Sequence, residues 1–475
     1  MQQKKIIISL RAFSKDELKA FDSFIRSPYF NKNQRLITLW DYLHRFAPDF
    51  DSPKLISKAA HKHLFEETDF QEKRLDRLLL KLYKLAEEFI AHQTVRQQPE
   101  VSHTFLLNWY DKKKLHRHFE QEAKSFDDWL KLHDPQASRF EHARFHLEKA
   151  QSNFLHRQKQ YARSDVNLES AMTALDHYYL VEKLMMATAM YNRQSVLPVS
   201  YTPAFLSTIE EKLNEDPAAF SSSVRLWYKA FCLVRASDAA QLYFELKEEL
   251  FSNFDMVGEH DGASLFFILQ NSLTKAVSQQ SASYFPELFD LYNIQIEKGW
   301  VFSDDGSVLV NVFKNIVTVG TTLGKLDWTR RFIKEHASYL RVEQKDDMLD
   351  YSHAMIAFEE KQYDEVLRLL APLSRTNIFF DLSIRRLILK VYYERNEEES
   401  LISGISTYRV FLHRLDRIAD YFKDANIAYL NILSAMSRLH FSGSDFQKRK
   451  ALKTEIDETG LLPERVWLLS KVGEL

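Results

Sequence analysis

Apolar residues recur at intervals of three and four along much of this chain, most clearly between residues 75 and 90. This spacing puts apolar side chains on one face of an α-helix, which turns once every 3.6 residues. Glycine and proline are scarce, at 10 and 11 of 475 residues, whereas typical usage is about 7% and 5%. The sequence therefore predicts an all-α protein of helices joined by short loops. The apolar positions of the clearest helix are Leu75, Leu78, Leu79, Leu82, Leu85, Ala86, Phe89 and Ile90.

Residues 1–95 are predicted to form a helical bundle of four helices, because four start signals precede apolar runs. The first helix is expected from about Lys15 to Arg26, after a capping box in which a serine and a glutamate satisfy each other's backbone amides. The predicted start signals are Ser14 with Glu17, Asn31 with Gln34, Ser52 with Pro53, and Asp69.

The corner between the first two predicted helices is the stretch FIRSPYFNKN, residues 24–33. Pro28 cannot continue a helix, and Asn31 is expected to cap the next one. Tyr29 and Phe30 are expected to hold the two helices together. This assignment makes the stretch a structural corner rather than a ligand site. The expected partners of Phe30 are Leu36 and Trp40.

The segment HQTVRQQPEVS, residues 92–102, is polar and loses the apolar period. It is therefore interpreted as a boundary between two domains. Residues 100–475 are predicted to form a helical-repeat array. Corresponding turns occur at Leu326 and Tyr363, 37 residues apart, and about 35 residues later near Glu397. This period is typical of helical-hairpin solenoids, in which antiparallel helix pairs stack to bury their apolar faces.

Residues 305–415 resemble tetratricopeptide-like repeats. The resemblance rests on Ala354 in a first helix and on Tyr363, Asp364 and Glu365, the aromatic and acidic residues that open a second. It implies a right-handed superhelix that binds partners on its concave face. The stretches SKDELKAFDSFIRSPYFNKN and LLPERVWLLSKV are also similar to those of uncharacterised bacterial helical-repeat proteins, a similarity that implies no activity.

The function predicted from this architecture is that of a non-enzymatic scaffold or adaptor, which binds a peptide or protein partner on the concave face of the array. No membrane or cofactor is expected to take part, and the predicted location is cytoplasmic because no signal-peptide core is present. Five aromatic residues are candidates for binding this partner, although burial in the core explains each of them at least as well as binding does. The aromatic candidates for partner binding are Tyr228, Tyr243, Tyr292, Trp300 and Trp328.

An uneven charge distribution leaves a nucleic-acid-associated adaptor as the alternative. Residues 1–165 carry 30 Lys and Arg against 23 Asp and Glu, whereas residues 166–475 carry 34 against 43. The basic end could bind phosphates, although interleaved acidic residues favour an ordinary solvated surface. A second basic patch lies at Lys448–Lys453. The basic candidates in the first third are Lys112, Lys113, Lys114 and Arg117.

Catalytic and metal motifs are incomplete. His142 and His146 lie four residues apart, so they could share a metal on one helix face, but the glutamate of the zinc-protease pattern is absent. A helical metalloenzyme is therefore the least favoured alternative. Residues 320–325 have three residues between their glycines, one fewer than a phosphate loop needs. These glycines are expected to allow close helix packing and a turn.

Overall fold

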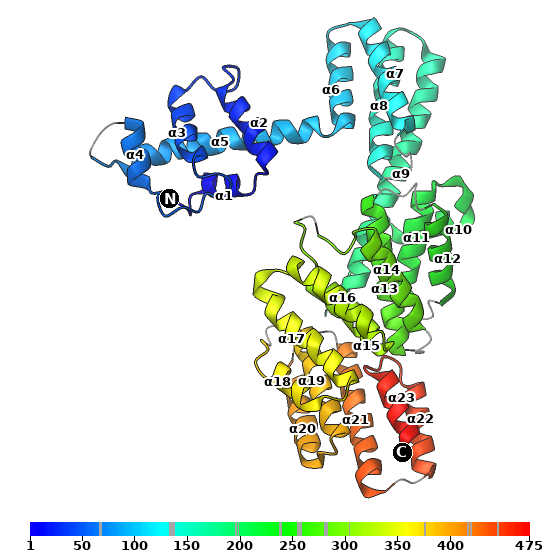
Figure 1. Cartoon of the computed structure of the whole chain (residues 1–475). Helices are drawn as coiled ribbons and strands as arrows, with labels where there is room; N and C mark the ends of the chain where they lie inside the picture. Colours follow the sequence, from blue (N-terminus) through cyan, green and yellow to red (C-terminus); the bar gives the residue numbers. More distant parts are fainter. Residues whose placement is uncertain are drawn as a thin grey trace. The chain divides into compact units, whose positions relative to one another are not determined.

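The computed structural model describes residues 1–65, 69–132, 138–194, 197, 199–236, 240–253, 259–279, 284–303, 305–374, 377–415, 418, 420–443 and 446–475. Within these ranges the regular structure is helical, apart from one isolated β-bridge between Phe302 and Val308 (Figure 1). The predicted all-α class is confirmed. A helix that is both long and apolar enough to span a bilayer does not occur in these ranges.

The chain divides into two compact units. Unit 1 comprises Met1–Trp129 and His146–Leu168, and unit 2 comprises Leu130–Phe145 and Glu169–Leu475. The first helices are α1 (Lys5–Arg11), α2 (Lys15–Arg26), α3 (Gln34–His44), α4 (Ser57–Phe65), α5 (Glu72–Arg96), α6 (Pro99–Lys112), α7 (His116–Leu132), α8 (Ser138–Arg157) and α9 (Tyr161–Gln194). They are followed by α10 (Leu206–Glu215), α11 (Ser222–Arg235), α12 (Ala240–Ser252), α13 (Glu259–Gln279), α14 (Phe285–Glu297), α15 (Val310–Thr322) and α16 (Leu326–His336). The last are α17 (Val342–Glu359), α18 (Tyr363–Leu370), α19 (Ile378–Glu394), α20 (Glu398–Arg414), α21 (Asp420–Ser442), α22 (Phe446–Glu458) and α23 (Arg465–Glu474).

The N-terminal part of unit 1 is built around α5, which contacts α1, α2, α3 and α4. The periodic apolar face of α5 is buried from Leu75 to Phe89, and only its last predicted member, Ile90, is exposed, at 43%. The capping box of Ser14 and Glu17 and the bounds of α2 are as predicted. Helix α1 is not among the four predicted helices, although its buried Ile6, Ile7 and Leu10 have helical spacing.

Three of the predicted helix starts are wrong. Asn33, not Asn31, caps α3 with its side chain. Helix α4 begins at Ser57, four residues beyond Pro53, because residues 52–55 form a turn instead. Helix α5 begins at Glu72 after Gln71, so Asp69 is not its cap. The polar segment after α5 is mostly helical, since α5 continues to residue 96 and α6 begins at residue 99.

The corner at residues 24–33 holds a buried amide beside a stacked aromatic pair. Asn31 is 7% exposed; its Nδ2 donates to the Ile25 carbonyl at 2.9 Å, and its Oδ1 accepts from the Asn33 amide at 2.9 Å. Phe30 stacks on Phe24, with ring centroids 3.9 Å apart, and packs against the core cluster that contains the predicted Leu36 and Trp40. Tyr29 is 85% exposed. The predicted role of Tyr29 in joining the helices is therefore wrong.

Replacing Asn31 by alanine is expected to cost about 2 kcal/mol of stability, because two buried backbone groups lose their partner. Asn33→Ala removes only the exposed cap of α3 and is expected to cost about 1 kcal/mol. Urea denaturation of both variants measures which of them loses more stability. A larger loss for Asn33→Ala than for Asn31→Ala would contradict the assignment of the buried amide.

Consecutive helices pack against each other through most of unit 2. From α11 to α23 each helix contacts the next one, and α11·α13, α15·α17 and α17·α19 also contact each other. One apolar core extends from Val181 to Val391, and a second from Leu382 to Val472. Because some of these helices contact their second neighbours as well as their immediate ones, the apolar faces of successive helix pairs join into a continuous core.

Three helix–helix turns in unit 2 share one geometry. Each places one residue in the left-handed region between two helices, and the next amide donates to a carbonyl five residues earlier, which is the Schellman pattern. Glycine adopts this conformation without strain, and asparagine tolerates it better than most residues. The left-handed residues are Gly324, Lys361 and Asn396, and the helices that follow begin at Leu326, Tyr363 and Glu398.

Gly320 allows the close helix packing that the sequence predicted. A Cβ atom at this position would lie 2.3 Å from Oγ1 of Thr329, which is fully buried on α16. The two helices α15 and α16 therefore touch at a point where a larger residue does not fit.

Candidate functional site

A pocket of about 450 Å³ lies within unit 2, where helices α14, α15, α17, α19 and α21 and the start of α23 meet. Its walls are mainly apolar and aromatic. Six charged side chains also line it, and four of them, Lys314, Arg386, Lys390 and Glu464, contact one another or share the partner Ser383. The apolar and aromatic lining includes Phe285, Tyr292, Tyr351, Met355, Phe422 and Trp467. The charged lining residues are Lys314, Glu359, Arg386, Lys390, Glu464 and Arg465.

The helices position these charges by simple spacing. Arg386 and Lys390 are four residues apart on α19, and so they project from one helix face. Lys314 lies on α15 beside the buried Phe313 and is itself half-buried. Glu464 follows a proline and has a left-handed backbone, with φ of 58°, at the residue that precedes α23. This conformation ends the loop and turns the carboxylate into the pocket.

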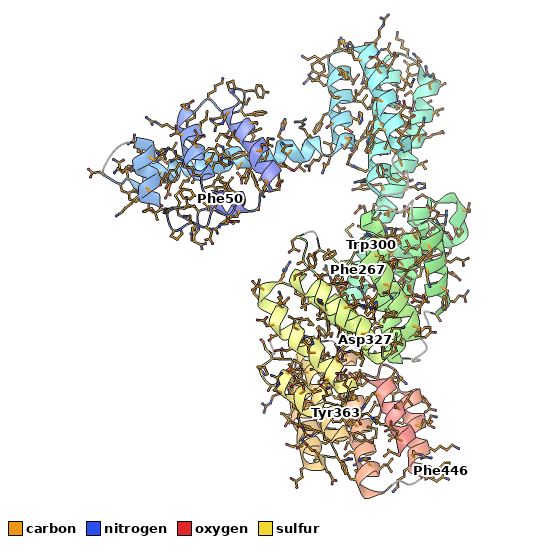
Figure 2. All side chains as sticks on the ribbon, viewed as in Figure 1. Phe50, Phe267, Trp300, Asp327, Tyr363 and Phe446 are labelled. Carbon is orange, nitrogen blue, oxygen red and sulfur yellow. The ribbon has the colours of Figure 1, made fainter. Side chains whose placement is uncertain are left out.

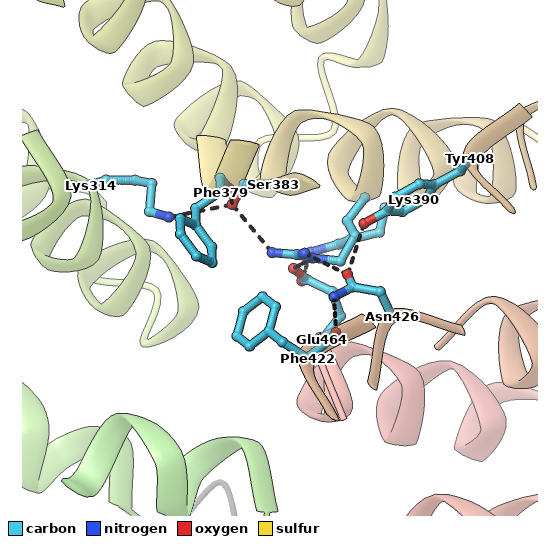
Figure 3. A network of polar contacts seen from close by, with 9 residues as sticks. Lys314, Phe379, Ser383, Lys390, Tyr408, Phe422, Asn426 and Glu464 are labelled. Carbon is cyan, nitrogen blue, oxygen red and sulfur yellow. Dashed lines mark hydrogen bonds and ion pairs between the residues drawn. The ribbon is translucent and has the colours of Figure 1, made fainter. Parts of the chain in front are cut away.

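Glu464 bridges the two cations of α19 (Figure 3). Arg386 Nε donates to Glu464 Oε1 at 3.2 Å, and Lys390 Nζ donates to Glu464 Oε2 at 3.1 Å. The exposed fractions of the side chains are 14% for Arg386, 7% for Lys390 and 27% for Glu464. Burial alone would raise the pKa of Glu464, but the charges of Lys390 and Arg386 outweigh it and lower this pKa to about 2. The carboxylate is therefore ionised throughout the physiological pH range.

A second set of hydrogen bonds fixes the guanidinium. Arg386 Nη1 donates to Asn426 Oδ1 at 3.0 Å, and Tyr408 donates to the same oxygen at 2.8 Å. Asn426 in turn donates to the Phe422 carbonyl at 2.8 Å. Arg386 Nη2 donates to Ser383 Oγ at 3.3 Å. These contacts hold the guanidinium of Arg386, which is one of the lining residues of the pocket, in one orientation.

Aromatic rings cover the other side of Lys390. Its Nζ lies 4.5 Å from the centroid of the Phe358 ring and 5.5 Å from that of Trp467. Both distances are within the range of cation–π attraction. Trp467 donates from Nε1 to Glu394 at 2.9 Å, and Lys471 contacts the same carboxylate at 3.0 Å. The segment that carries Glu464 is thus attached to α19 at two places.

Lys314 differs from the other two cations because its ammonium has no carboxylate partner among the residues that the structure describes. Its Nζ donates to Ser383 Oγ at 3.4 Å, a long contact. Burial, followed by repulsion from Arg386, lowers the pKa of Lys314 to about 8, although Glu464 acts in the opposite direction. The result is a partly desolvated cation at the pocket, still mainly protonated at pH 7.

The predicted aromatic candidates are distributed through unit 2, and only one of them lines the pocket. Tyr292 lines it and is 3% exposed, and Tyr243 is 2% exposed, so neither ring is open to solvent. Tyr228 is half-buried and donates to Asn214 at 2.8 Å.

The two tryptophan candidates are half-buried and pack against neighbouring rings. Trp300 is labelled in Figure 2. The Trp300 ring meets Phe266 at 5.3 Å, and the Trp328 ring meets Phe289 at 4.6 Å. The structure therefore does not bring the five predicted aromatics together into one surface.

The predicted basic residues lie in unit 1. The residues Lys112, Lys113, Lys114 and Arg117 are exposed at the turn between α6 and α7.

The predicted metal candidate His142 packs its ring against Tyr178, with centroids 4.8 Å apart. Within the described part of the chain, three or more His, Cys, Asp or Glu side chains do not gather in a group that could hold a metal ion.

The pocket charges are functional candidates that the sequence reasoning missed. A signal for them exists. Lys390 interrupts the otherwise apolar stretch LILKVYY, Arg386 lies one helical turn before it in SIRR, and Lys314 interrupts VNVFKNIVTV. Charged residues at positions where the helical period requires apolar ones indicate a buried polar group, because burial of an unpaired charge is costly.

Comparisons of the chain with protein-family models, with curated proteins and with solved structures give no match.

Proposed function

We propose that this chain is a non-enzymatic protein-interaction scaffold whose second unit is a tetratricopeptide-like array of antiparallel helix pairs in a right-handed superhelix. Support for the array comes from the three turns of one geometry, at Gly324, Lys361 and Asn396, and from the contacts of each helix with its neighbours. Stacked helix pairs of this kind present an extended surface for a partner.

The observation that carries the proposal is the environment of the Lys314 ammonium. Its half-buried ammonium makes a long hydrogen bond to Ser383 and meets no carboxylate within the described ranges, so it has lost much of its hydration without gaining a counterion there. An acidic group from a partner would supply that counterion, and it would do so beside the fixed guanidinium of Arg386. Charge-assisted contacts in such a setting are stronger than neutral ones.

The apolar walls define the rest of the partner. Phe285, Met355 and Phe422 would cover an apolar side chain next to the acidic group. We therefore propose that the bound element is a peptide segment with an acidic residue beside an apolar one. Glu464 already neutralises Arg386 and Lys390 in part, so Lys314 provides most of the selectivity for the additional negative charge.

A pull-down with paired variants tests this function. Wild-type chain and Lys314→Glu are used as baits in a cell lysate, and Lys334→Glu, at an exposed position on α16, is the matched control. A partner is expected to be retained by wild type and by the control, and lost from Lys314→Glu. The affinity of the purified partner should fall by at least about tenfold, as for loss of a charge-assisted hydrogen bond. Equal retention by all three baits would reject the pocket as the binding site.

Partner binding is expected to weaken as the pH rises through about 8, the pKa of Lys314. Above that pH the ammonium loses its charge and no longer attracts an anionic group. Binding should also raise this pKa, because a bound carboxylate stabilises the protonated form. Calorimetric titration at pH 7 and pH 9 measures the effect. An affinity that is the same at both values would show that Lys314 does not contact the partner's charge.

A further inference from the structure

We infer that one end of unit 1 binds single-stranded nucleic acid. This surface, called the basic tip below, consists of residues 105–120 and 154–165, which surround the α6–α7 turn and the α8–α9 turn. Both turns lie at the same end of their helices (Figure 1). It is separate from the pocket of unit 2, and the inference does not depend on the function proposed above.

Direct contacts join the two halves of the basic tip. Arg157 Nη2 donates to Asp111 Oδ2 at 2.5 Å, and the side chains of Gln158 and His116 are hydrogen-bonded at 2.6 Å. The His116 ring also meets Phe154 at 5.5 Å. Two segments about 45 residues apart in sequence therefore form one continuous surface.

The basic tip is positively charged. It contains seven lysines and arginines, all exposed, and three acidic residues, of which Asp111 is already paired with Arg157. Only the α6–α7 half stands out in the sequence as a basic run; the structure adds the α8–α9 half. The seven basic residues are Lys112, Lys113, Lys114, Arg117, Arg157, Lys159 and Arg163.

Exposed aromatic rings lie between these cations. Phe105 is 59% exposed, Trp109 52% and Tyr161 54%. Trp109 is in edge contact with Tyr110 at 5.5 Å, which leaves the larger ring open to solvent. Proteins that bind single strands combine cations along the backbone with rings on which bases stack.

The distribution of rings and charges favours a nucleic acid over a membrane surface. A helix that lies in a bilayer interface segregates its apolar residues on one continuous face, with cations on the other. In the basic tip, Trp109 and Tyr161 come from different helices and each has cations within the next four residues. Rings separated by cations match a chain of bases and phosphates.

Fluorescence anisotropy with the full chain and a labelled 20-nucleotide oligothymidylate tests the inference. Binding is expected at 50 mM salt, and the logarithm of affinity should fall with the logarithm of salt by about 0.7 for each phosphate contact. Lys112→Glu with Lys113→Glu should weaken binding by at least about tenfold. The matched control, Lys450→Glu with Lys453→Glu on α22, changes the net charge equally and should leave the affinity within about twofold.

Trp109→Ala separates stacking from charge. It is expected to weaken single-strand binding by about tenfold, because the stacking of one base is lost, and to leave binding of a duplex of the same length almost unchanged. Equal unfolding midpoints establish that the variants remain folded. Absence of binding at 50 mM salt, equal losses in the two double variants, an equal effect of Trp109→Ala on duplex, or tighter binding to phosphatidylserine vesicles than to the oligonucleotide would each overturn the inference.

Discussion

Replacing Glu464 by glutamine is expected to lower the free energy of unfolding by about 3–5 kcal/mol. The carboxylate neutralises both Arg386 and Lys390, at 3.2 and 3.1 Å. Glutamine keeps the size of the side chain but not its charge, so two cations of low exposure would share one neutral oxygen. Breaking a buried ion pair from one side costs more than the pair contributes, because the remaining charge stays desolvated. Urea denaturation measures the loss.

The pH dependence of stability provides an independent readout of the same contact. The native pKa of Glu464 is about 2, against 4.5 ordinarily. Between these values the unfolded chain binds more protons than the native one, so the stabilisation is complete above pH 4.5 and is lost as the pH falls toward 2. Glu464→Gln should lack this component. Glu365→Gln, which removes the exposed pair with Arg368, is the control and should leave the midpoint unchanged. An unfolding free energy for Glu464→Gln within 1 kcal/mol of wild type would show that the network does not stabilise unit 2.

Gly320→Val is expected to destabilise unit 2 by about 3 kcal/mol, the upper end of the range for overpacking a core. The added Cβ would lie 2.3 Å from Thr329 Oγ1, which cannot rotate away freely because it donates to the Lys325 carbonyl at 3.0 Å. Helices α15 and α16 would have to separate. Thermal or urea unfolding measures the change.

Two comparisons isolate the steric cause. Gly473→Val, at a helical position where a Cβ would meet nothing within 4 Å, should change stability by less than about 0.5 kcal/mol. In the milder variant Gly320→Ala, a second change of Thr329→Ala should recover part of the loss, because the colliding oxygen is gone. Purely additive effects of these two substitutions would argue that the helices do not touch at this point.

The helical class and several element bounds are predictable from the sequence because they depend on local information. The capping box of Ser14 and Glu17 and the periodic face of α5 involve residues within a few turns of one another. The cap of α3 is missed because Asn31 and Asn33 have the same local preference. Their roles differ only because the carbonyl of Ile25, in the preceding helix, accepts a hydrogen bond from the side-chain amide of Asn31.

The site is less predictable for the same reason. The side chains of Lys390 and Glu464 are 74 residues apart in sequence, and no local pattern pairs them. The sequence favours aromatic candidates such as Tyr243 because exposed rings bind partners, but period alone cannot separate a buried ring from an exposed one. Tyr243 lies in the core, where its hydroxyl donates to Glu287 at 2.7 Å.

The position of Glu464 along the chain has a consequence for synthesis. Arg386 and Lys390 leave the ribosome 78 and 74 residues before the carboxylate that neutralises them. Until then, burying α19 against its neighbours would leave two charges without a counterion. Because this is costly, we expect both side chains to stay hydrated in the nascent chain. The last helices of unit 2 therefore complete its folding after most of the chain has been made, whereas unit 1 ends at Leu168.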